Sequence, residues 1–567
     1  MTAHSDSRHH EHLRHLIWLE RRDLWTVFAF SVGAGLMALA TPIAVQTLVN
    51  TIAFGMLIQP LVVLVLVLVG CLTVFNLLIA LQIYVVEMLQ RRVFVRLVGT
   101  ITSRLQRVTL AAFDGHNGPE LVNRFFDVMT VQKSGTALLL DGLAYGLQAV
   151  IGMLLLAFYH PVLLALDILL VVSIFGIFAS LLRRGVETAI QESRTKYAVA
   201  AWLQELARNT TLFKWAGGLH HASAISDRMS NDYLRASAAH FSIAMRQQVG
   251  LLILHTIANT ALLGLGGWMV IERQLTLGQL IAAELVVNAM MAGLSRLGKS
   301  LMSYYDLMAA MDKLGHLIDL PQERQNGAPL PPSSLPASVT LHKLTFTHGP
   351  DHRADQMVRG LCASAAAGQR IALCGSAGSG RDTLLEILMG LRMPASGTVL
   401  IDGFDIRDLQ LGKLRQDMAV VRSMEIIEDS VLENIRVGRE NIAIQTIRDT
   451  LEALGLADDI MALEDGLNTP LNYLGQPLPP EKLRRLLLAR AVVGKPRLLL
   501  LHETLDALDP EVSEPVIDWV LRPEAPWTAI VVTRNPAVIA RCDRLWQLEN
   551  GHLTETPVTL SHPATQD

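Results

Sequence analysis

The chain has 567 residues, of which 51% are hydrophobic and 18% are charged, and its formal net charge is -4. Soluble domains carry roughly 25% charged residues, so this composition excludes an ordinary soluble enzyme and an intrinsically disordered chain. The small negative charge does not favour nucleic acid as a partner. The four cysteines are too scattered for a zinc site or a disulfide framework, and we interpret them as buried thiols in a reducing compartment.

Long apolar segments indicate a membrane domain. Residues 57–86 carry no charged side chain, and a helix of that length can cross a hydrocarbon core of about 30 Å at about 1.5 Å per residue. Similar segments give six expected spans, at residues 24–54, 57–86, 142–159, 161–182, 248–271 and 276–295. Asp167 and Glu284 lie within two of them, and we interpret Asp167 as lying near a membrane surface.

The distribution of basic residues predicts the topology. Lys and Arg concentrate in the long segments after the second and fourth expected spans, whereas the loops between spans one and two and between spans three and four contain none. The positive-inside rule therefore places both long segments and both termini in the cytoplasm. Periodic apolar residues in these segments predict helices that continue beyond the bilayer.

The remaining chain divides by composition. Residues 1–20 contain several histidines but no apolar run of a signal peptide, and we favour a disordered His-rich tail over a metal-binding one. Residues 21–318 form the expected transmembrane domain, and residues 319–337, rich in proline and serine, the expected linker. In residues 338–567, short apolar strands alternate with helical stretches, which indicates a soluble α/β domain.

A glycine loop stands between a predicted strand, Ile371–Cys374, and a predicted helix that contains Leu384. In this context backbone N–H groups and a helix N-terminus bind phosphates. The loop has the glycine spacing of the P-loop pattern G-x-x-x-x-G-K-[ST], but Arg381 replaces the lysine and Asp382 replaces the Ser/Thr. The candidate nucleotide-binding residues of the loop are Gly375, Ser376, Ala377, Gly378, Ser379, Gly380, Arg381, Asp382 and Thr383.

Six spans with two long cytoplasmic extensions and a linked α/β domain resemble, over nearly the whole chain, the half-transporters of the ATP-binding-cassette type I exporter family. Residues 274–281 and 304–314 are similar to the branch that exports proteins and peptides in type I secretion. The resemblance implies an α-helical transmembrane domain fused to a P-loop cassette domain, dimerisation around composite ATP sites, and a place in the plasma (inner) membrane.

The resemblance also assigns positions in the nucleotide site. His348 falls where the family has an adenine-stacking aromatic residue, and Arg422 falls at the Q-loop glutamine. His502 stands at the Walker B aspartate, and Arg534 stands at the switch histidine. Only Glu503 retains its family identity here, at the position of the general base.

These substitutions predict weak nucleotide chemistry. Asp382 offers no neutral hydroxyl to Mg²⁺, and His502 removes an acidic partner of that metal, so Mg²⁺ is not expected to bind and ATP binding is expected to be weak at most. At the position of the LSGGQ signature, Pro479 and Pro480 have no backbone N–H for a γ-phosphate. Prolines followed by Glu481 nevertheless favour the start of a helix.

The new charges have two interpretations. Fixed cations at Arg422, His502 and Arg534 either bind an anion without Mg²⁺, or close the site by ion pairs, and we favour ion pairs. Glu503 is either a remnant general base or, in our preferred interpretation, an acid paired with Arg422, Arg534 or His502.

Three functions are compatible with the sequence. The favoured one is a membrane subunit of an ATP-binding-cassette export system with little or no ATP hydrolysis, which exports protein or peptide beside an intact partner. The alternatives are an independent ATP-driven exporter with divergent motifs and a membrane scaffold or sensor without transport. The expected partners are the membrane, a second copy of the chain or an intact half-transporter, and further secretion-system components.

Overall fold

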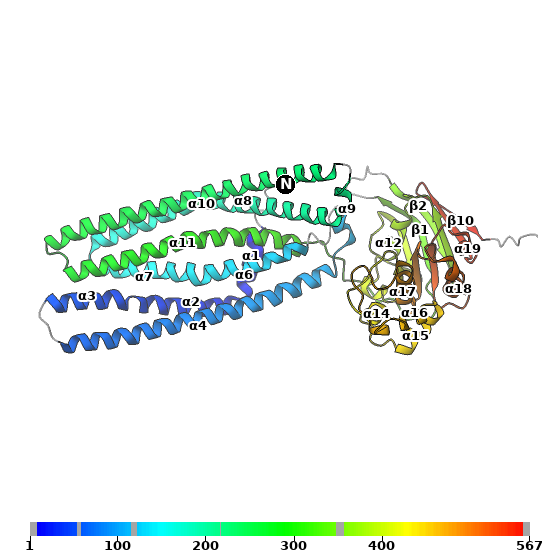
Figure 1. The fold of residues 1–567 in the computed structure, drawn as a ribbon, viewed down its shortest axis with the longest axis horizontal. Coiled ribbons are helices and arrows are strands. Elements are labelled where there is room, and N and C mark those ends of the chain that lie inside the picture. The colour runs from blue at the N-terminus through cyan, green and yellow to red at the C-terminus, as the bar shows by residue number, and fades with distance from the viewer. Residues whose placement is uncertain (1–7, 54–57, 115–121, 216, 348–355, 559–567) are drawn as a thin grey trace, which may run out of the picture. The chain divides into compact units, whose positions relative to one another are not determined.

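The computed structural model describes residues 8–53, 58–114, 122–215, 217–347 and 356–558 (Figure 1). Contacts divide the chain into two compact units. One contains the chain up to Val108 and then Ala112–Pro321, and the other contains Thr109–Ala111 and the chain from Gln322 onward.

The first unit is helical (Figure 1). Its helices are α1 (Arg8–Leu19), α2 (Arg21–Ala38), α3 (Ala40–Ala53), α4 (Ile58–Leu105), α6 (Asp127–Ala137), α7 (Leu143–Tyr159), α8 (Pro161–Arg208), α9 (Thr210–Phe213), α10 (Gly218–Ile271) and α11 (Leu277–Ile318). Short 3₁₀ turns lie at Leu110–Phe113 and Arg124–Phe126, and a π-helical turn lies at Leu138–Gly142.

Two of the long helices begin with strong local signals. α8 starts at Pro161, where the missing N–H costs nothing because the first helical N–H groups have no partner within the helix. α11 starts with a capping box, in which the Gln279 N–H donates to the Thr276 hydroxyl over 3.1 Å and the Thr276 N–H donates to the Gln279 side chain over 2.8 Å.

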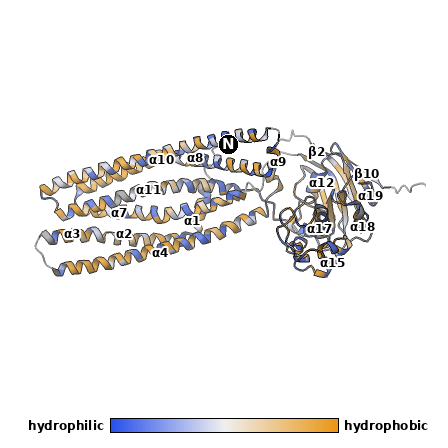
Figure 2. Ribbon diagram, in the orientation of Figure 1, coloured by the Kyte–Doolittle hydropathy of each residue, from blue (hydrophilic) through white to orange (hydrophobic). Residues whose placement is uncertain are grey.

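Helices of the first unit are long and apolar enough to cross a membrane (Figure 2). Among the described residues, the five segments that meet both conditions are Arg21–Asn50, Gln59–Leu105, Arg124–Phe158, Pro161–Arg208 and Gly218–Ile271. The expected sixth span stays a prediction, because the apolar part of α11, Leu277–Asn288, is shorter. On α4, Val63 and Leu66 are 60% and 67% exposed, which suits a surface that faces lipid.

The N-terminal segment differs from the sequence prediction. Residues Arg8–Leu19 form helix α1, so the expectation of a disordered tail is wrong for this part, and residues 1–7 lie outside the described residues. Leu13 and Leu16 pack against the hydrophobic cluster of α4, α6 and α11, and His12 Nε2 lies 3.1 Å from the Asp319 carboxylate. Tertiary packing therefore orders a polar sequence that has little helical bias of its own.

The second unit contains two sheets. A four-stranded antiparallel sheet has the order β2-β1-β4-β5, and a six-stranded sheet has the order β10-β9-β3-β8-β7-β6. The strands are β1 (Val339–Thr347), β2 (Gln356–Ala365), β3 (Arg370–Gly375), β4 (Ser396–Ile401), β5 (Phe404–Asp405), β6 (Met418–Val421), β7 (Leu498–His502), β8 (Thr528–Val532), β9 (Arg544–Glu549) and β10 (His552–Pro557).

Helices pack around these sheets. They are α12 (Arg381–Leu388), α13 (Leu411–Leu414), α14 (Val431–Arg436), α15 (Ile444–Ala453), α16 (Ala457–Met461), α17 (Pro480–Val492), α18 (Pro510–Val520) and α19 (Pro536–Ile539), with a 3₁₀ turn at Gly466–Asn468. β3, β6, β7, β8 and β9 are parallel, and alternate residues of β3 enter different hydrophobic cores: Ile371 and Leu373 enter one, and Ala372 enters the other. Burial on both faces explains why these strands are continuously apolar.

Residues 319–337 contain no helix and no strand, apart from isolated bridges, and the part after Pro321 is bonded to the second unit. Arg324 donates to the carbonyl of Leu409 over 2.8 Å, and Arg415 donates to both carboxylate oxygens of Glu323 over 2.7 and 2.8 Å. The segment that the composition predicts to be a linker is thus fixed by specific bonds to residues near α13.

Thr528 joins the start of β8 to two neighbouring segments. Its buried hydroxyl donates to the Ala337 carbonyl over 2.6 Å and accepts from the Gly368 N–H over 2.9 Å. Thr528→Val should lower the local unfolding free energy of β8 by about 1–3 kcal/mol, because the Ala337 carbonyl and the Gly368 N–H would each lose the hydrogen bond to this buried hydroxyl. Hydrogen exchange of the full chain measures this, with Thr554→Val on the exposed strand β10 as the matched control; equal exchange in the two variants would contradict it.

Candidate functional site

The glycine loop connects β3 to α12, as the sequence predicts. Gly378 and Gly380 have φ angles of 78° and 101°, a region that favours glycine. A Cβ atom on Gly375 would lie 2.3 Å from the carbonyl oxygen of Leu548, so this position also requires glycine. The loop therefore has the backbone geometry and the strand–loop–helix context of a phosphate-binding loop.

Asp382 and His502 contact each other at the mouth of this loop. Asp382 lies in the first turn of α12, and His502 is the last residue of β7. The His502 Nε2 atom lies 2.6 Å from Asp382 Oδ1, and the exposed fractions of the two side chains are 18% and 59%. The carboxylate at the Ser/Thr position of the pattern thus contacts the residue at the end of β7, which is separated from β3 in the sheet by β8.

Glu503 pairs with a different residue from those predicted. Its Oε1 lies 3.3 Å from Nη2 of Arg381, so the expectation of a pair with Arg422, Arg534 or His502 is wrong. The Arg381 side chain is 9% exposed, and its Nη1 atom is buried without a hydrogen-bond partner among the described residues. Glu503 has a φ angle of 50°, and its N–H donates to the Val532 carbonyl over 2.9 Å.

Asp506 holds Arg534 beside the loop. The Asp506 carboxylate accepts the hydroxyl of Thr533 and, over 2.7 Å, the backbone N–H of Arg534. The Arg534 guanidinium lies 3.4 Å from the Gly375 carbonyl. By the family resemblance Asp506–Asp509 corresponds to the D-loop, but Asp506 itself is not among the binding residues predicted from the sequence.

A pocket of about 480 Å³ brings these side chains together. Its lining residues are Ala377, Gly378, Arg381, Asp382, His502, Glu503, Asp506 and Arg534. Within the pocket Arg381 pairs with Glu503 and Asp382 contacts His502, whereas the Arg534 guanidinium contacts the Gly375 carbonyl. This arrangement agrees with the ion-pair interpretation of the substitutions.

Arg422 lies outside this pocket. Its Nη1 is 2.7 Å from Oε1 of Glu386 on α12, and Arg392 lies 2.5 Å from the other oxygen of the same carboxylate. Arg422 instead lines a second pocket, of about 300 Å³, beside β6 and α17. The expectation that Arg422 is a fixed cation of the same site as His502 and Arg534 is therefore wrong, because the carboxylate of Glu386 holds its side chain elsewhere.

The other predicted residues have varied environments. Ser379 is buried, and its hydroxyl oxygen has no hydrogen-bond partner among the described residues, whereas the Thr383 hydroxyl donates to the Met357 sulfur over 3.2 Å. Gly375, Ser376 and Gly380 belong to the loop backbone but do not line the 480 Å³ pocket. His348 lies outside the described residues. Burial raises the pKa of the neighbouring Cys374 thiol, which favours its neutral form.

The proline segment starts a helix, as the sequence predicts. α17 begins at Pro480, with Pro479 as the preceding cap residue. Glu481 contacts Arg485 over 2.8 Å, and Lys482 contacts Asp459 over 2.6 Å. The first turn of α17 is therefore fixed by ion pairs.

Comparison with known proteins gives two family matches on this chain. The ABC transporter transmembrane region matches residues 24–294, and the ABC transporter domain matches residues 358–506. The "Structure of a bacterial Atm1-family ABC exporter with ATP bound" superposes with a TM-score of 0.84 over 95% of both chains at 20% identity, which shows the fold alone.

Similar proteins include exporters named for different substrates. The Alpha-hemolysin translocation ATP-binding protein HlyB of Escherichia coli O157:H7 is 22% identical over 541 residues, which are 94% of this chain and 76% of that protein. The ATP-dependent lipid A-core flippase of Ralstonia nicotianae is 26% identical over 480 residues, 83% of this chain and 80% of that protein. Alignments with further HlyB proteins of Escherichia coli cover 48% of their length, so the chain spans about half of those relatives.

The two family matches cover successive parts of one chain, and each coincides with one structural unit: apolar helices in the first and a P-loop domain in the second. The chain therefore belongs to the ABC transporters, as an exporter half-transporter that is an integral membrane protein with one transmembrane domain and one ABC domain.

Proposed function

We propose that this half-transporter is a membrane subunit of an ABC export system with little or no ATP hydrolysis of its own. The supporting observation is the contact between Asp382 and His502. Asp382 stands where a P-loop offers a hydroxyl to Mg²⁺, and its carboxylate lies 2.6 Å from the imidazole at the end of β7. These residues do not fit Mg²⁺, because the imidazole occupies one carboxylate oxygen and supplies no acidic support of its own.

The pair of Arg381 and Glu503 supports the same proposal. A general base needs access to a positioned water, whereas one oxygen of Glu503 lies 3.3 Å from the Arg381 guanidinium. Arg381 stands at the position of the P-loop lysine, so the two groups that would act on a γ-phosphate are directed at each other. A planar guanidinium also does not replace a compact ammonium in a tight loop.

The partner in the proposed assembly is an intact ABC half-transporter. In the family each ATP lies between one P-loop and the signature segment of the opposite subunit. In a homodimer of this chain each composite site would have an altered P-loop, with Arg381 and Asp382, and an altered signature segment, with Pro479 and Pro480. An intact partner would supply an unaltered P-loop to one composite site and an unaltered signature segment to the other. Each site would still contain one altered part, so we expect weak ATP turnover at most from the composite sites. Any strong ATPase activity would come from the partner.

The proposed cargo is protein or peptide, and the proposed place is the inner membrane with both termini and the ABC domain in the cytoplasm. The similarity to HlyB proteins, which are named for translocation of alpha-hemolysin, supports a protein cargo. The orientation rests on the basic segments after the second and fourth expected spans. A second candidate, an independent ATP-driven exporter, is favoured by Glu503, which lines the 480 Å³ pocket.

The test measures Mg-ATP turnover by the purified full-length chain in nanodiscs. We expect turnover at least ~100-fold below the roughly 1 s⁻¹ at the lower end of ordinary enzyme rates. Glu503→Gln should leave the residual rate unchanged, which identifies that rate as contamination, and mass spectrometry of co-purifying proteins should reveal an ABC protein with intact motifs. Robust turnover that Glu503→Gln abolishes would refute the proposal and support the independent exporter.

A further inference from the structure

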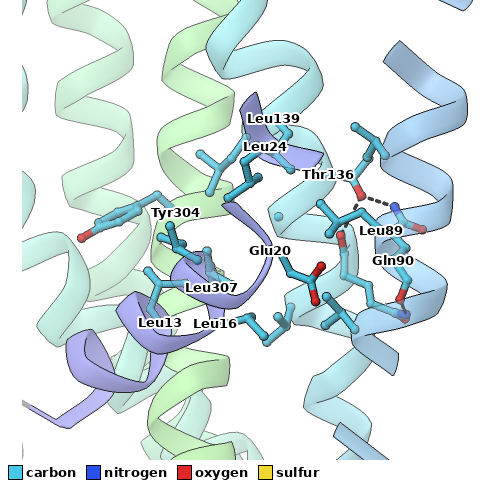
Figure 3. Close-up of a pocket in the computed structure, with 17 residues that line it drawn as sticks. Leu13, Leu16, Glu20, Leu24, Leu89, Gln90, Thr136, Leu139, Tyr304 and Leu307 are labelled. Atoms are coloured by element: carbon cyan, nitrogen blue, oxygen red, sulfur yellow. Dashed lines mark hydrogen bonds between the residues drawn. The ribbon is translucent and has the colours of Figure 1, made fainter. Parts of the chain in front are cut away.

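A pocket of about 310 Å³ lies within the first unit, where α1, α2, α4, α6 and α11 meet (Figure 3). Leucine side chains from separate parts of the chain converge on it. They are Leu13, Leu16, Leu24, Leu89, Leu138, Leu139 and Leu307. Its volume falls at the lower end of the range of ligand pockets, roughly 300–1,000 Å³.

Gln90, Gln132 and Thr136, three polar residues of the pocket wall, are hydrogen-bonded to one another. The side-chain amide of Gln90 donates to the Thr136 hydroxyl, and this hydroxyl donates to the backbone carbonyl of Gln132 over 2.8 Å. The side-chain amide of Gln132 donates to the backbone carbonyl of Gln90 over 2.8 Å. Because these groups are bonded within the wall (Figure 3), the surface offered to an occupant is mostly hydrocarbon.

The pocket lies where the apolar part of the membrane helices ends. On α4 the uncharged run ends at Val86, which lines the pocket together with Val93 one to two turns later, beyond the charged Glu87. Trp18, near the end of α1, and Trp25, near the start of α2, are 60% and 68% exposed. Exposed tryptophans flanking a change from apolar to charged residues are typical of the interface between hydrocarbon and head groups.

A fixed cation lies beside the charged residue of the wall. Glu20 lines the pocket, is 4% exposed, and forms ion pairs with Arg96 and, over 3.4 Å, with Arg92. Arg92 also lies 2.6 Å from Asp23. The Arg92 side chain nevertheless remains 52% exposed, so its guanidinium is held in place while part of it can contact an anionic group such as a phosphate.

We propose that this pocket binds one acyl chain of a membrane phospholipid, with the phosphate of that lipid near Arg92. An apolar cavity of this size is unfavourable when empty, since its wall forfeits dispersion contacts. A hydrocarbon chain needs no hydrogen bonds from the wall, and a phospholipid places its phosphate at the level of the interfacial arginine. The bound chain would fill the space between α1 and the bundle and so hold the N-terminal helix on the membrane domain.

Gly135 provides a variant that fills the pocket. Gly135 lines it, and a Cβ atom placed there would meet nothing within 4 Å. Gly135→Leu should therefore place a side chain in the cavity without a backbone clash, and Gly135→Ala should fill it partly. Gly146 on α7 offers the matched control, because a Cβ atom there also meets nothing within 4 Å and the residue does not line the pocket.

The experiment uses the full chain in nanodiscs that contain a phospholipid with a photoactivatable diazirine at the end of one acyl chain. After irradiation, mass spectrometry should find labels on the pocket residues Leu89 and Leu307. Gly135→Leu should reduce this labelling at least fivefold, Gly135→Ala should reduce it less, and Gly146→Leu should leave it unchanged. Labels on the exposed residues Val63 and Leu66 of α4, which face lipid in any case, should be equal in all variants.

Three results would overturn the proposal. Labelling of Leu89 and Leu307 could be absent, or it could be equal in Gly135→Leu and Gly146→Leu. Alternatively, a free fatty acid with the same diazirine could label the pocket while the phospholipid does not, which would identify a free fatty acid as the ligand. If Gly135→Leu does not fold, as judged by gel filtration, the comparison of Gly135→Ala with Gly146→Ala decides, because one added methyl group is tolerated in either helix.

Discussion

The combined variant Arg381→Lys, Asp382→Ser and His502→Asp should tighten Mg-dependent ATP binding by the full chain at least about tenfold, which is about 1.4 kcal/mol at 25 °C. These changes restore the lysine, the hydroxyl and the acidic group of a P-loop site and remove the contact between Asp382 and His502. The glycine loop already has the required backbone, so the side chains are the component to be changed. Calorimetric titration of ATP with Mg²⁺ and with EDTA measures the effect.

The matched control alters another ion pair of the same kind in the same unit. Arg541 and Asp518 form a pair outside the pocket, so Arg541→Lys with Asp518→Ser should leave ATP binding unchanged. Tight Mg-ATP binding by the natural chain would refute the expected gain. Metal-independent binding by the natural chain at micromolar concentration would refute the ion-pair interpretation and favour fixed cations as the anion-binding groups.

Glu386→Ala should lower the local unfolding free energy around α12 by about 3–5 kcal/mol, the usual effect of removing one member of a buried ion pair. The Glu386 side chain is 7% exposed and lies within 2.7 Å of Arg422 and 2.5 Å of Arg392, and Arg392 is itself 9% exposed. Hydrogen exchange of α12 peptides in the full chain should accelerate by roughly two to four orders of magnitude.

Two further variants separate this effect from a general loss of charge. Glu440→Ala, at an exposed position, should change the local free energy by no more than about 0.5 kcal/mol. Arg422→Gln should have a smaller effect than Glu386→Ala, because the Arg422 side chain is 35% exposed and can reach water. Unchanged exchange in Glu386→Ala would show that the buried carboxylate does not hold α12.

The fold could be predicted where local signals were strong. The uncharged run on α4 indicates a membrane helix by length alone, and the glycines of the loop specify a turn between β3 and α12. Helix α1 was missed, because its histidines and charges are typical of a solvated tail, although Leu13, Leu16 and Ile17 have helical spacing and Leu13 and Leu16 pack against distant helices. The sixth span also has a weaker signal, since the apolar part of α11 is short.

The site could be predicted as a set of positions but not as a set of contacts. Sequence spacing brings Arg381, Asp382, His502 and Glu503 to the ends of adjacent elements, and the structure does place them around one pocket. Spacing does not tell which carboxylate meets which cation, and so Arg381 was not expected to be the partner of Glu503. The position of Arg422 depends on Glu386, a residue on a side of α12 that the P-loop pattern does not include.

The ion pairs of the second unit also constrain the evolution of this chain. Arg381 with Glu503, Asp382 with His502, and Arg422 with Glu386 form three couples. A change of Asp382 alone or of His502 alone would remove one member of its couple, whereas Arg381→Lys keeps the positive charge beside Glu503 and Arg392 still pairs with Glu386 when Arg422 is lost. We therefore expect Asp382 and His502 to tolerate substitution together better than either one alone, because the two side chains in contact are energetically coupled.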